Sequence, residues 1–155
     1  MSKLLIFLFP FIFLFSSCEE IDFYEQSVVI NEHLWKRGDT IRGEFLISDT
    51  TVNYDIFLVL RHTDAYKYNN IWLEMGLKGP SDSLSVQKLD ITLGSDAGGW
   101  EGSGMNDIRE VRKKLTPFPR KFLNPGSYRY QIRQVMRDNP LQHVISVGLR
   151  VQAAR

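Results

Sequence analysis

Apolar and polar residues alternate along much of this chain. Successive side chains of a β-strand point to opposite faces of the sheet, so a period of two predicts strands. The alternation is clearest in residues 41–47, 71–77, 128–132 and 145–151. Each segment keeps its apolar residues on one face, as antiparallel strands with one wet face do. The residues predicted to face a core are Ile41, Phe45, Ile47, Ile71, Leu73, Met75, Leu77, Tyr128, Tyr130, Ile132, Ile145, Val147, Leu149 and Val151.

Two further apolar segments complete the predicted fold. Residues 56–60 are all apolar, which predicts a central strand over 54–60 that is covered on both faces. In residues 84–93 the apolar positions change parity, which predicts one more strand with an irregular step near residues 87–88. Turn residues separate these runs. We expect an all-β domain, an antiparallel jelly-roll-like β-sandwich of seven or eight strands.

One short helix is predicted over residues 106–115. Asp107 and Glu110 lie in its first turn, and the basic run 112–114 lies near its end, which complements the helix dipole. Pro117 would stop the helix shortly afterwards.

The N-terminus has the layout of an export signal. Lys3 precedes the uncharged, mainly apolar residues 4–15, and Ser16-Ser17-Cys18 follow. Twelve helical residues span about 18 Å, whereas a membrane-spanning helix needs about 20 residues. The segment also lacks the polar stripe of a core helix. We therefore expect residues 1–17 to be a cleaved signal peptide.

The cleavage region resembles the lipobox of bacterial lipoproteins, with Phe15 at the position where that motif usually has Leu. The resemblance implies that Cys18 becomes the first residue and carries acyl chains such as palmitate. Cys18 is the only cysteine, so an internal disulfide is impossible. Stable anchoring takes more than one acyl chain, which lipoproteins of this kind possess.

The remaining chain is long enough for one domain. Removing residues 1–17 from 155 leaves 138, with 18–27 as lipidated N-terminus and tether, 28–151 as the sandwich and 152–155 as a frayed tail. Lys3 is the only charge removed, so 19 basic residues become 18, against 18 acidic ones. A nucleic-acid-binding protein would carry a basic excess, so we expect no nucleic-acid partner.

The sequence shows no pattern typical of a catalytic or metal site. It has no Gly-x-Ser-x-Gly motif, and its three histidines are far apart, although a zinc site could assemble from distant strands. Asp49, Asn53 and Asp55 offer oxygen atoms to calcium, but without EF-hand spacing, and such residues are common in turns. We expect no enzymatic activity and no cofactor.

Residues 61–70 form the most polar and aromatic loop candidate. They can be a recognition loop, because Tyr and Arg are enriched at interface hot spots. Alternatively Asp64 and residues 69–70 build a turn, Tyr66 and Tyr68 cover the core edge, and Arg61 pairs with a carboxylate.

Two further residues join this candidate surface. Trp100, among glycines, can stack on a sugar or a partner, or can close the open end of the sandwich. Arg137 continues the parity of Arg129 and Arg133, which gives either a basic stripe for an acidic partner or a solvated strand face. The complete candidate interaction surface is Arg61, His62, Tyr66, Tyr68, Asn69, Asn70, Trp100 and Arg137.

An ordered set of segments resembles the gliding-motility lipoproteins called GldH of the Bacteroidetes. The matching segments are WKRGDT (35–40), DTTVNYD (49–55), LRHTDAYKYNN (60–70), WEGSG (100–104), GSY (126–128), QVMRDNPL (134–141) and VGLR (147–150). The resemblance implies a lipoprotein required for gliding and linked to type IX secretion, on the periplasmic side of the outer membrane. It implies no enzymatic activity.

Three functions follow as competing hypotheses. The first is a non-enzymatic, lipid-anchored protein that docks on another envelope protein of the gliding or secretion apparatus. The second is a carbohydrate-binding sandwich, which would have a shallow aromatic groove. The third is a hydrolase, which would need two carboxylates or a Ser–His pair converging in a pocket.

Overall fold

The computed structural model describes residues 23–154, which form strands and one 3-10 turn. The eight long strands are β1 (Phe23–Val29), β3 (Ile41–Ile47), β4 (Asn53–Thr63), β5 (Asn70–Lys78), β6 (Ser85–Thr92), β10 (Ile108–Lys114), β12 (Gly126–Gln134) and β14 (Val144–Ala153). The short elements are η1 (Asn31–His33), β2 (Leu34–Trp35), β7 (Gly94–Ser95), β8 (Gly99–Trp100), β9 (Ser103–Met105), β11 (Arg120–Lys121) and β13 (Leu141–Gln142). Residues 23–154 contain no helix with the length and apolar character of a membrane-spanning segment.

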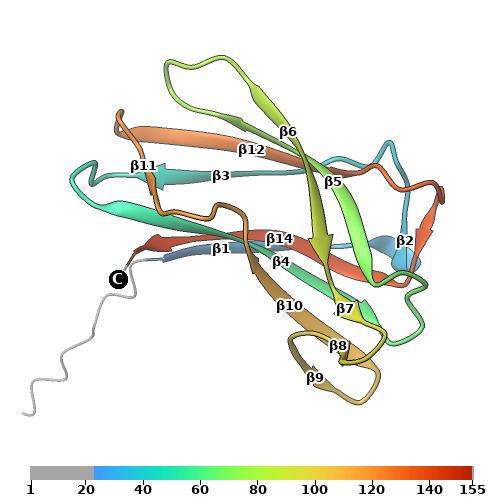
Figure 1. The fold of residues 1–155 in the computed structure, drawn as a ribbon. Helices are drawn as coiled ribbons and strands as arrows, with labels where there is room; N and C mark the ends of the chain where they lie inside the picture. Colours follow the sequence, from blue (N-terminus) through green and yellow to red (C-terminus); the bar gives the residue numbers. More distant parts are fainter. Residues whose placement is uncertain (1–22, 155) are drawn as a thin grey trace, which may run out of the picture.

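The long strands form two antiparallel sheets that face each other (Figure 1). The first, called here the β1 sheet, has the order β1-β14-β4-β10-β9, with β11 also paired to β4. The second, the β3 sheet, has the order β3-β12-β5-β6. Successive long strands cross between the sheets, apart from the β5–β6 hairpin, which gives the jelly-roll order. The predicted antiparallel β-sandwich is confirmed, and the predicted 54–60 strand is central, between β14 and β10.

The residues predicted to face the core are buried between the sheets, with one exception. A register shift in the β4–β14 ladder between Val144 and Ser146 interrupts the alternation. Val144 is therefore fully buried, whereas Ile145 is only partly buried. A bulge of this kind leaves one residue of a strand out of register, which the apolar pattern alone does not reveal.

The predicted helix over 106–115 is wrong, because residues 108–114 form strand β10. This strand pairs with β4 along its whole length and with β9 on its other side. Val111 points into the core and is buried. Pairing with the open side of β4 outweighs the local helical preference, as tertiary context often does. Asn106, with φ of 56°, occupies the turn before the strand.

One other strand feature and two segment boundaries differ from the predictions. Strand β6 pairs with β5 in regular register, so the step near 87–88 is absent, and Leu84 and Val86 are exposed. Residues 23–27, assigned to the tether, are part of β1. Residues 152–153, assigned to the frayed tail, belong to β14. The predicted signal peptide, residues 1–17, and the predicted lipidation site Cys18 lie outside the described residues.

Aromatic side chains close both ends of the sandwich. At one end, the Trp100 ring meets the His62 ring edge-on with centroids 4.6 Å apart, and Tyr66 packs beside both. We call this the Trp100 end. It contains the loop 64–69 and strands β7 to β9, at the right of Figure 1.

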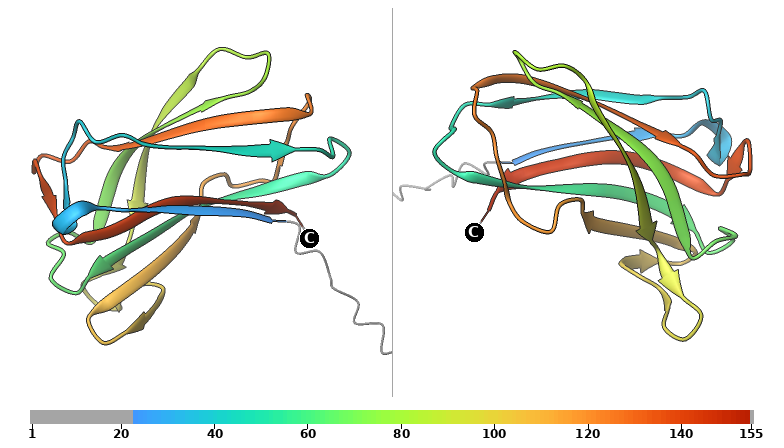
Figure 2. Two further views of the ribbon diagram at one scale, coloured as in Figure 1. Left: turned by 180° about the vertical axis from the view of Figure 1, so that it is seen from behind. Right: turned by 45° about the horizontal axis from the view of Figure 1, so that its top comes forward.

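Phe122 closes the opposite end, called here the Phe122 end. Its ring contacts Tyr128 of the β3 sheet at 4.6 Å and Tyr54 of the β1 sheet at 5.6 Å between centroids. Phe23 and the end of β14 also lie here, because Phe23 pairs with Gln152 (Figure 2). The chain therefore enters and leaves the sandwich at the Phe122 end.

His62 should make the stability of the fold depend on pH. Its ring is fully buried, and its Nε2 atom has no hydrogen-bond partner in residues 23–154. Burial lowers the pKa of His62 below its ordinary value of 6.5, since it disfavours the charged ring. The unfolded chain then binds a proton at a higher pH than the folded one. The contribution of the neutral His62 ring to stability is fully present above about pH 6.5. It is lost as the pH falls from there toward the pKa of His62 in the folded protein.

We therefore expect the free energy of unfolding in urea to fall by up to about 1.4 kcal/mol per pH unit in that window. The variant His62→Gln should show a flatter profile between about pH 8 and about pH 5. The control His33→Gln, at an exposed position, should keep the slope of the parent. Equal slopes for the parent and His62→Gln would contradict this assignment.

The neighbours Phe122 and Leu123 should differ sharply in their effect on stability. Phe122 is 2% exposed and Leu123 is 79% exposed. Truncation of a buried Phe leaves a cavity, so Phe122→Ala should lower the free energy of unfolding by about 3–5 kcal/mol. Leu123→Ala should change it by less than about 0.5 kcal/mol. Urea unfolding of both variants tests this prediction. Similar losses of stability in the two variants would show that Phe122 does not close this end of the sandwich.

Candidate functional site

The charged residues of the 61–70 loop are paired within the fold. Arg61 lies 2.6 Å from a carboxylate oxygen of Glu110. Asp64 accepts two hydrogen bonds from Arg109, at 2.8 and 3.2 Å, and this pairing holds the pKa of Asp64 below its usual range. Arg61 thus pairs with a carboxylate, as the structural alternative for this loop expects. Asn69 is exposed in the turn.

Two members of the predicted interaction surface lie in the interior. His62 is fully buried, and Tyr66 is buried with its hydroxyl donating to the carbonyl of Asn70 at 3.1 Å. Burial raises the pKa of Tyr66, so the phenol stays protonated. Trp100 is partly buried against both rings. These three residues therefore close the Trp100 end, where Tyr66 and Trp100 also line a small hollow of about 230 Å³ with Tyr68 and Asn69.

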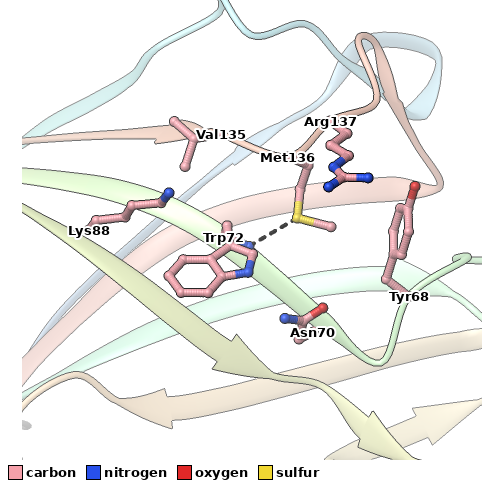
Figure 3. Close-up of a pocket in the computed structure, with 7 residues that line it drawn as sticks. All are labelled: Tyr68, Asn70, Trp72, Lys88, Val135, Met136 and Arg137. Carbon is pink, nitrogen blue, oxygen red and sulfur yellow. Dashed lines mark hydrogen bonds between the residues drawn. The ribbon is translucent and has the colours of Figure 1, made fainter.

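Three further members of the predicted surface meet in a groove. Tyr68, Asn70 and Arg137 line a hollow of about 440 Å³ together with Trp72 and Lys88 (Figure 3). Val135 and Met136 complete its wall. We call this hollow the Trp72 groove. It lies on the outer face of the β3 sheet, toward the Trp100 end.

Hydrogen bonds hold the wall of the groove in place. The backbone N–H of Trp72 donates to Met136 Sδ at 3.1 Å, and Val135 N–H donates to the Trp72 carbonyl at 3.0 Å. The buried side chain of Gln134 accepts from Met136 N–H at 2.8 Å. Arg37 donates to the Met136 carbonyl at 2.6 Å. Segments 35–40 and 134–141 therefore position the groove, although Arg37 does not line it.

The groove combines an exposed aromatic ring with two unpaired cations. Trp72 is 37% exposed, and Lys88 Nζ lies 4.8 Å from its ring centre. Figure 3 shows Lys88 on one side of Trp72, with Arg137 and Tyr68 on the other. Within residues 23–154 neither Lys88 nor Arg137 forms an ion pair, whereas Asp90 accepts a hydrogen bond from Asn70 at 2.7 Å.

The predicted basic stripe does not form as a line. Strand β12 ends at Gln134, so Arg137 leaves the row of Arg129 and Arg133. Arg133 is paired with Glu74 of the neighbouring strand. Arg129 instead borders a second hollow of about 550 Å³, which lies on the same face but nearer the Phe122 end.

This second hollow is also basic. Its walls include Arg42, Lys78 and Arg129, none of which forms an ion pair in the described part of the chain. Leu84 contributes an exposed apolar side chain. Glu44 also lines this hollow, opposite Arg129 in the β3–β12 ladder. The outer face of the β3 sheet therefore carries several cations without an ion pair in residues 23–154, interspersed with the carboxylates of Glu44 and Asp90.

The guanidinium groups on the outer face of the β1 sheet are ion-paired. Glu25 lies 2.7 Å from Arg150 and 3.4 Å from Arg112. Glu110 lies 2.6 Å from Arg61 and 3.0 Å from Arg112. Two carboxylates thus serve three guanidinium groups, and this contrast identifies the β3 sheet as the face with free charge for a partner.

The residues considered for metal binding have structural roles where the structure describes them. No group of three or more His, Cys, Asp or Glu residues within 23–154 is placed to hold a metal ion. Asp49 accepts hydrogen bonds from the backbone and hydroxyl of Thr51, at 2.7 and 2.6 Å. These hydrogen bonds lower the pKa of Asp49, as in a turn.

The alternation that predicts β5 also contained the signal for Trp72. In residues 71–77, Trp72 occupies a polar, outward position, where a large aromatic side chain is unusual. Lys88 gave no comparable signal, because its relation to Trp72 depends on the β5–β6 register.

Comparison with known proteins places the chain in a family. Residues 22–151 match the family described as GldH lipoprotein. The chain is 30% identical over 155 residues to the gliding motility lipoprotein GldH homolog of Christiangramia forsetii, with coverage of 95% of this chain and 94% of that protein. It is 26% identical over 128 residues to the gliding motility lipoprotein GldH of Flavobacterium johnsoniae, covering 76% and 77% of the two chains. No solved structure matches the chain significantly. The matched residues cover nearly the whole described domain, and the chain therefore belongs to the GldH lipoprotein family.

Proposed function

We propose that this protein is a non-enzymatic lipoprotein that supports gliding motility and the associated type IX secretion machinery. It is anchored by lipid on Cys18 to the outer membrane, on the periplasmic side, and binds another envelope protein through the Trp72 groove. Both relatives are named gliding motility lipoproteins, one of them as a GldH homolog, which supports the process. The family description supports the lipid anchor.

The position of Cys18 fits this anchor. It follows directly on the apolar segment 4–15 and the small residues Ser16-Ser17, and it precedes Glu19-Glu20. The family match begins at residue 22, just after this cysteine. A lipidated cysteine at the boundary between signal and domain accounts for the presence of a single cysteine there.

The Trp72 groove carries the proposal of a protein partner. Interface hot spots combine Trp, Tyr and Arg side chains in partly dehydrated pockets, and Trp72, Tyr68 and Arg137 provide these residue types. Lys88 and Arg137 favour a partner segment with acidic side chains, because both cations lack a carboxylate partner within 23–154. The second basic hollow extends the same preference along the sheet.

The groove also supports carbohydrate binding as a second candidate function. A shallow hollow lined by Tyr68 and Trp72 resembles the aromatic surfaces on which sugars stack. Lys88, however, lies over the Trp72 ring and covers part of the surface that a sugar would use. We therefore favour the protein partner, and a glycan array with the purified protein distinguishes the two.

Lipidation should depend on Cys18. Cells fed a clickable fatty acid should yield a labelled parent protein and an unlabelled Cys18→Ser variant, because the thiol is the attachment site. The variant should also leave the membrane fraction, since its body has no helix within 23–154 that could span a bilayer. An unlabelled parent, together with unchanged fractionation of Cys18→Ser, would contradict the anchor.

The Trp72 groove should be needed for partner capture. In crosslinking from native membranes, the double variant Trp72→Ala with Lys88→Ala should lose the captured envelope protein. Loss of a hot-spot Trp costs about 2 kcal/mol or more, which corresponds to roughly thirtyfold weaker binding. The control Met105→Ala changes an even more exposed apolar residue outside the groove and should capture the partner normally. Unchanged capture by the double variant would exclude the groove as the docking surface.

A further inference from the structure

The connection between β10 and β12 exposes two large apolar side chains at the Phe122 end. Phe118 and Leu123 are each 79% exposed. Single exposed apolar residues are common on protein surfaces. These two, however, lie on one short segment, on either side of the basic pair Arg120 and Lys121.

Neither side chain is required to cover the core, because Phe122 already does so. Phe122 is buried between the sheets, and the Arg120 guanidinium lies 5.3 Å from its ring centre. Strand β11 fixes the segment by pairing with the first residues of β4. The segment is thus held by Phe122, while Phe118 and Leu123 face outward.

This rim lies at the end of the sandwich where the chain enters from Cys18. Phe23 pairs with Gln152, Gln152 pairs with Asp55, and β11 pairs with the residues just before Asp55. Phe23 is therefore three strands from β11, a distance of about 15 Å at about 4.8 Å per strand. Figure 1 shows the start of β1 and the β11 segment at the same end.

The chain between Cys18 and the fold is short. Four residues lie between Cys18 and Phe23, and the five steps from one Cα atom to the next reach at most about 18 Å when fully extended. A lipid on Cys18 consequently keeps the Phe122 end close to the membrane surface. The exposed apolar pair and the basic pair then face the region where lipid acyl chains meet headgroups.

We propose that the Phe122 end is a second membrane contact, in which Phe118 and Leu123 enter the lipid surface and Arg120 with Lys121 lie among the phosphate headgroups. This inference rests on the proposed lipid anchor at Cys18. Arg120 and Lys121 are exposed and form no ion pair within residues 23–154. Apolar side chains beside Lys and Arg are typical of proteins that lie at a membrane interface.

Two contacts would orient the domain. The Trp72 groove begins six residues along β5 from Lys78, which pairs with Arg129 at the Phe122 end. Six strand residues span about 20 Å. The second contact therefore holds the groove above the headgroups and directed toward the aqueous side, where a protein partner can reach it.

Site-specific fluorescence in vesicles tests this contact. Lipidation consumes the native thiol, so Phe118→Cys and Leu123→Cys each give one site for an environment-sensitive dye such as NBD. The purified lipidated protein is reconstituted in vesicles of phosphatidylethanolamine and phosphatidylglycerol. Dyes at positions 118 and 123 should show blue-shifted emission, and should lose intensity when the vesicles contain lipids with a nitroxide on the acyl chain.

The control dye is placed at Met105→Cys, which has the same 79% exposure but lies at the Trp100 end. It should keep its spectrum in water and should not be quenched. If the dyes at 118 and 123 behave like the control while the protein floats with the vesicles, the second contact is overturned and the lipid anchor stands. If the protein fails to float, the anchor itself is overturned, and the second contact with it.

Discussion

The packing of β4 between β14 and β10 determines most of what this domain can do. The strand runs the full length of the sandwich, and its middle residues Leu58 and Leu60 are buried in the core. Tyr54 near its start packs against Phe122 at one end of the sandwich, and His62 near its end packs against Trp100 at the other. Loss of this strand would separate the sheet edges and open both ends at once.

The two outer faces show how charge is distributed around this core. On the β1 sheet, carboxylates from β1 and β10 neutralise the guanidinium groups of three strands. On the β3 sheet, most cations have no such partner in the described chain. The net charge of the chain hides this asymmetry, since it does not show which charges are paired with one another. A neutral protein can therefore still attract an acidic partner to one side.

The period-two pattern predicted the sandwich because each long strand buries one face. It failed for β10, where acidic residues at the start and basic residues at the end resemble the charge pattern of a helix. Residues 108–114 form a strand because they pair with β4, which the local sequence does not reveal. The candidate surface was predicted less well. His62 and Tyr66 were placed outside, although they lie in the core, because a polar loop does not reveal which of its aromatic residues close the sandwich end. The Trp72 groove joins residues 68, 70, 72, 88 and 135–137, which only the β5–β6 and β5–β12 registers bring together.

The entry of the chain at the Phe122 end also limits where the protein can work. Under the proposed anchor at Cys18, the tether of about 18 Å and a sandwich about 33 Å long would allow contact only within roughly 50 Å of the bilayer. A protein anchored in this way would search a thin layer by lateral diffusion rather than the volume of the surrounding aqueous compartment. Its partner must enter that layer, either as a component of the same membrane or as a part of a larger machine that stands upon it.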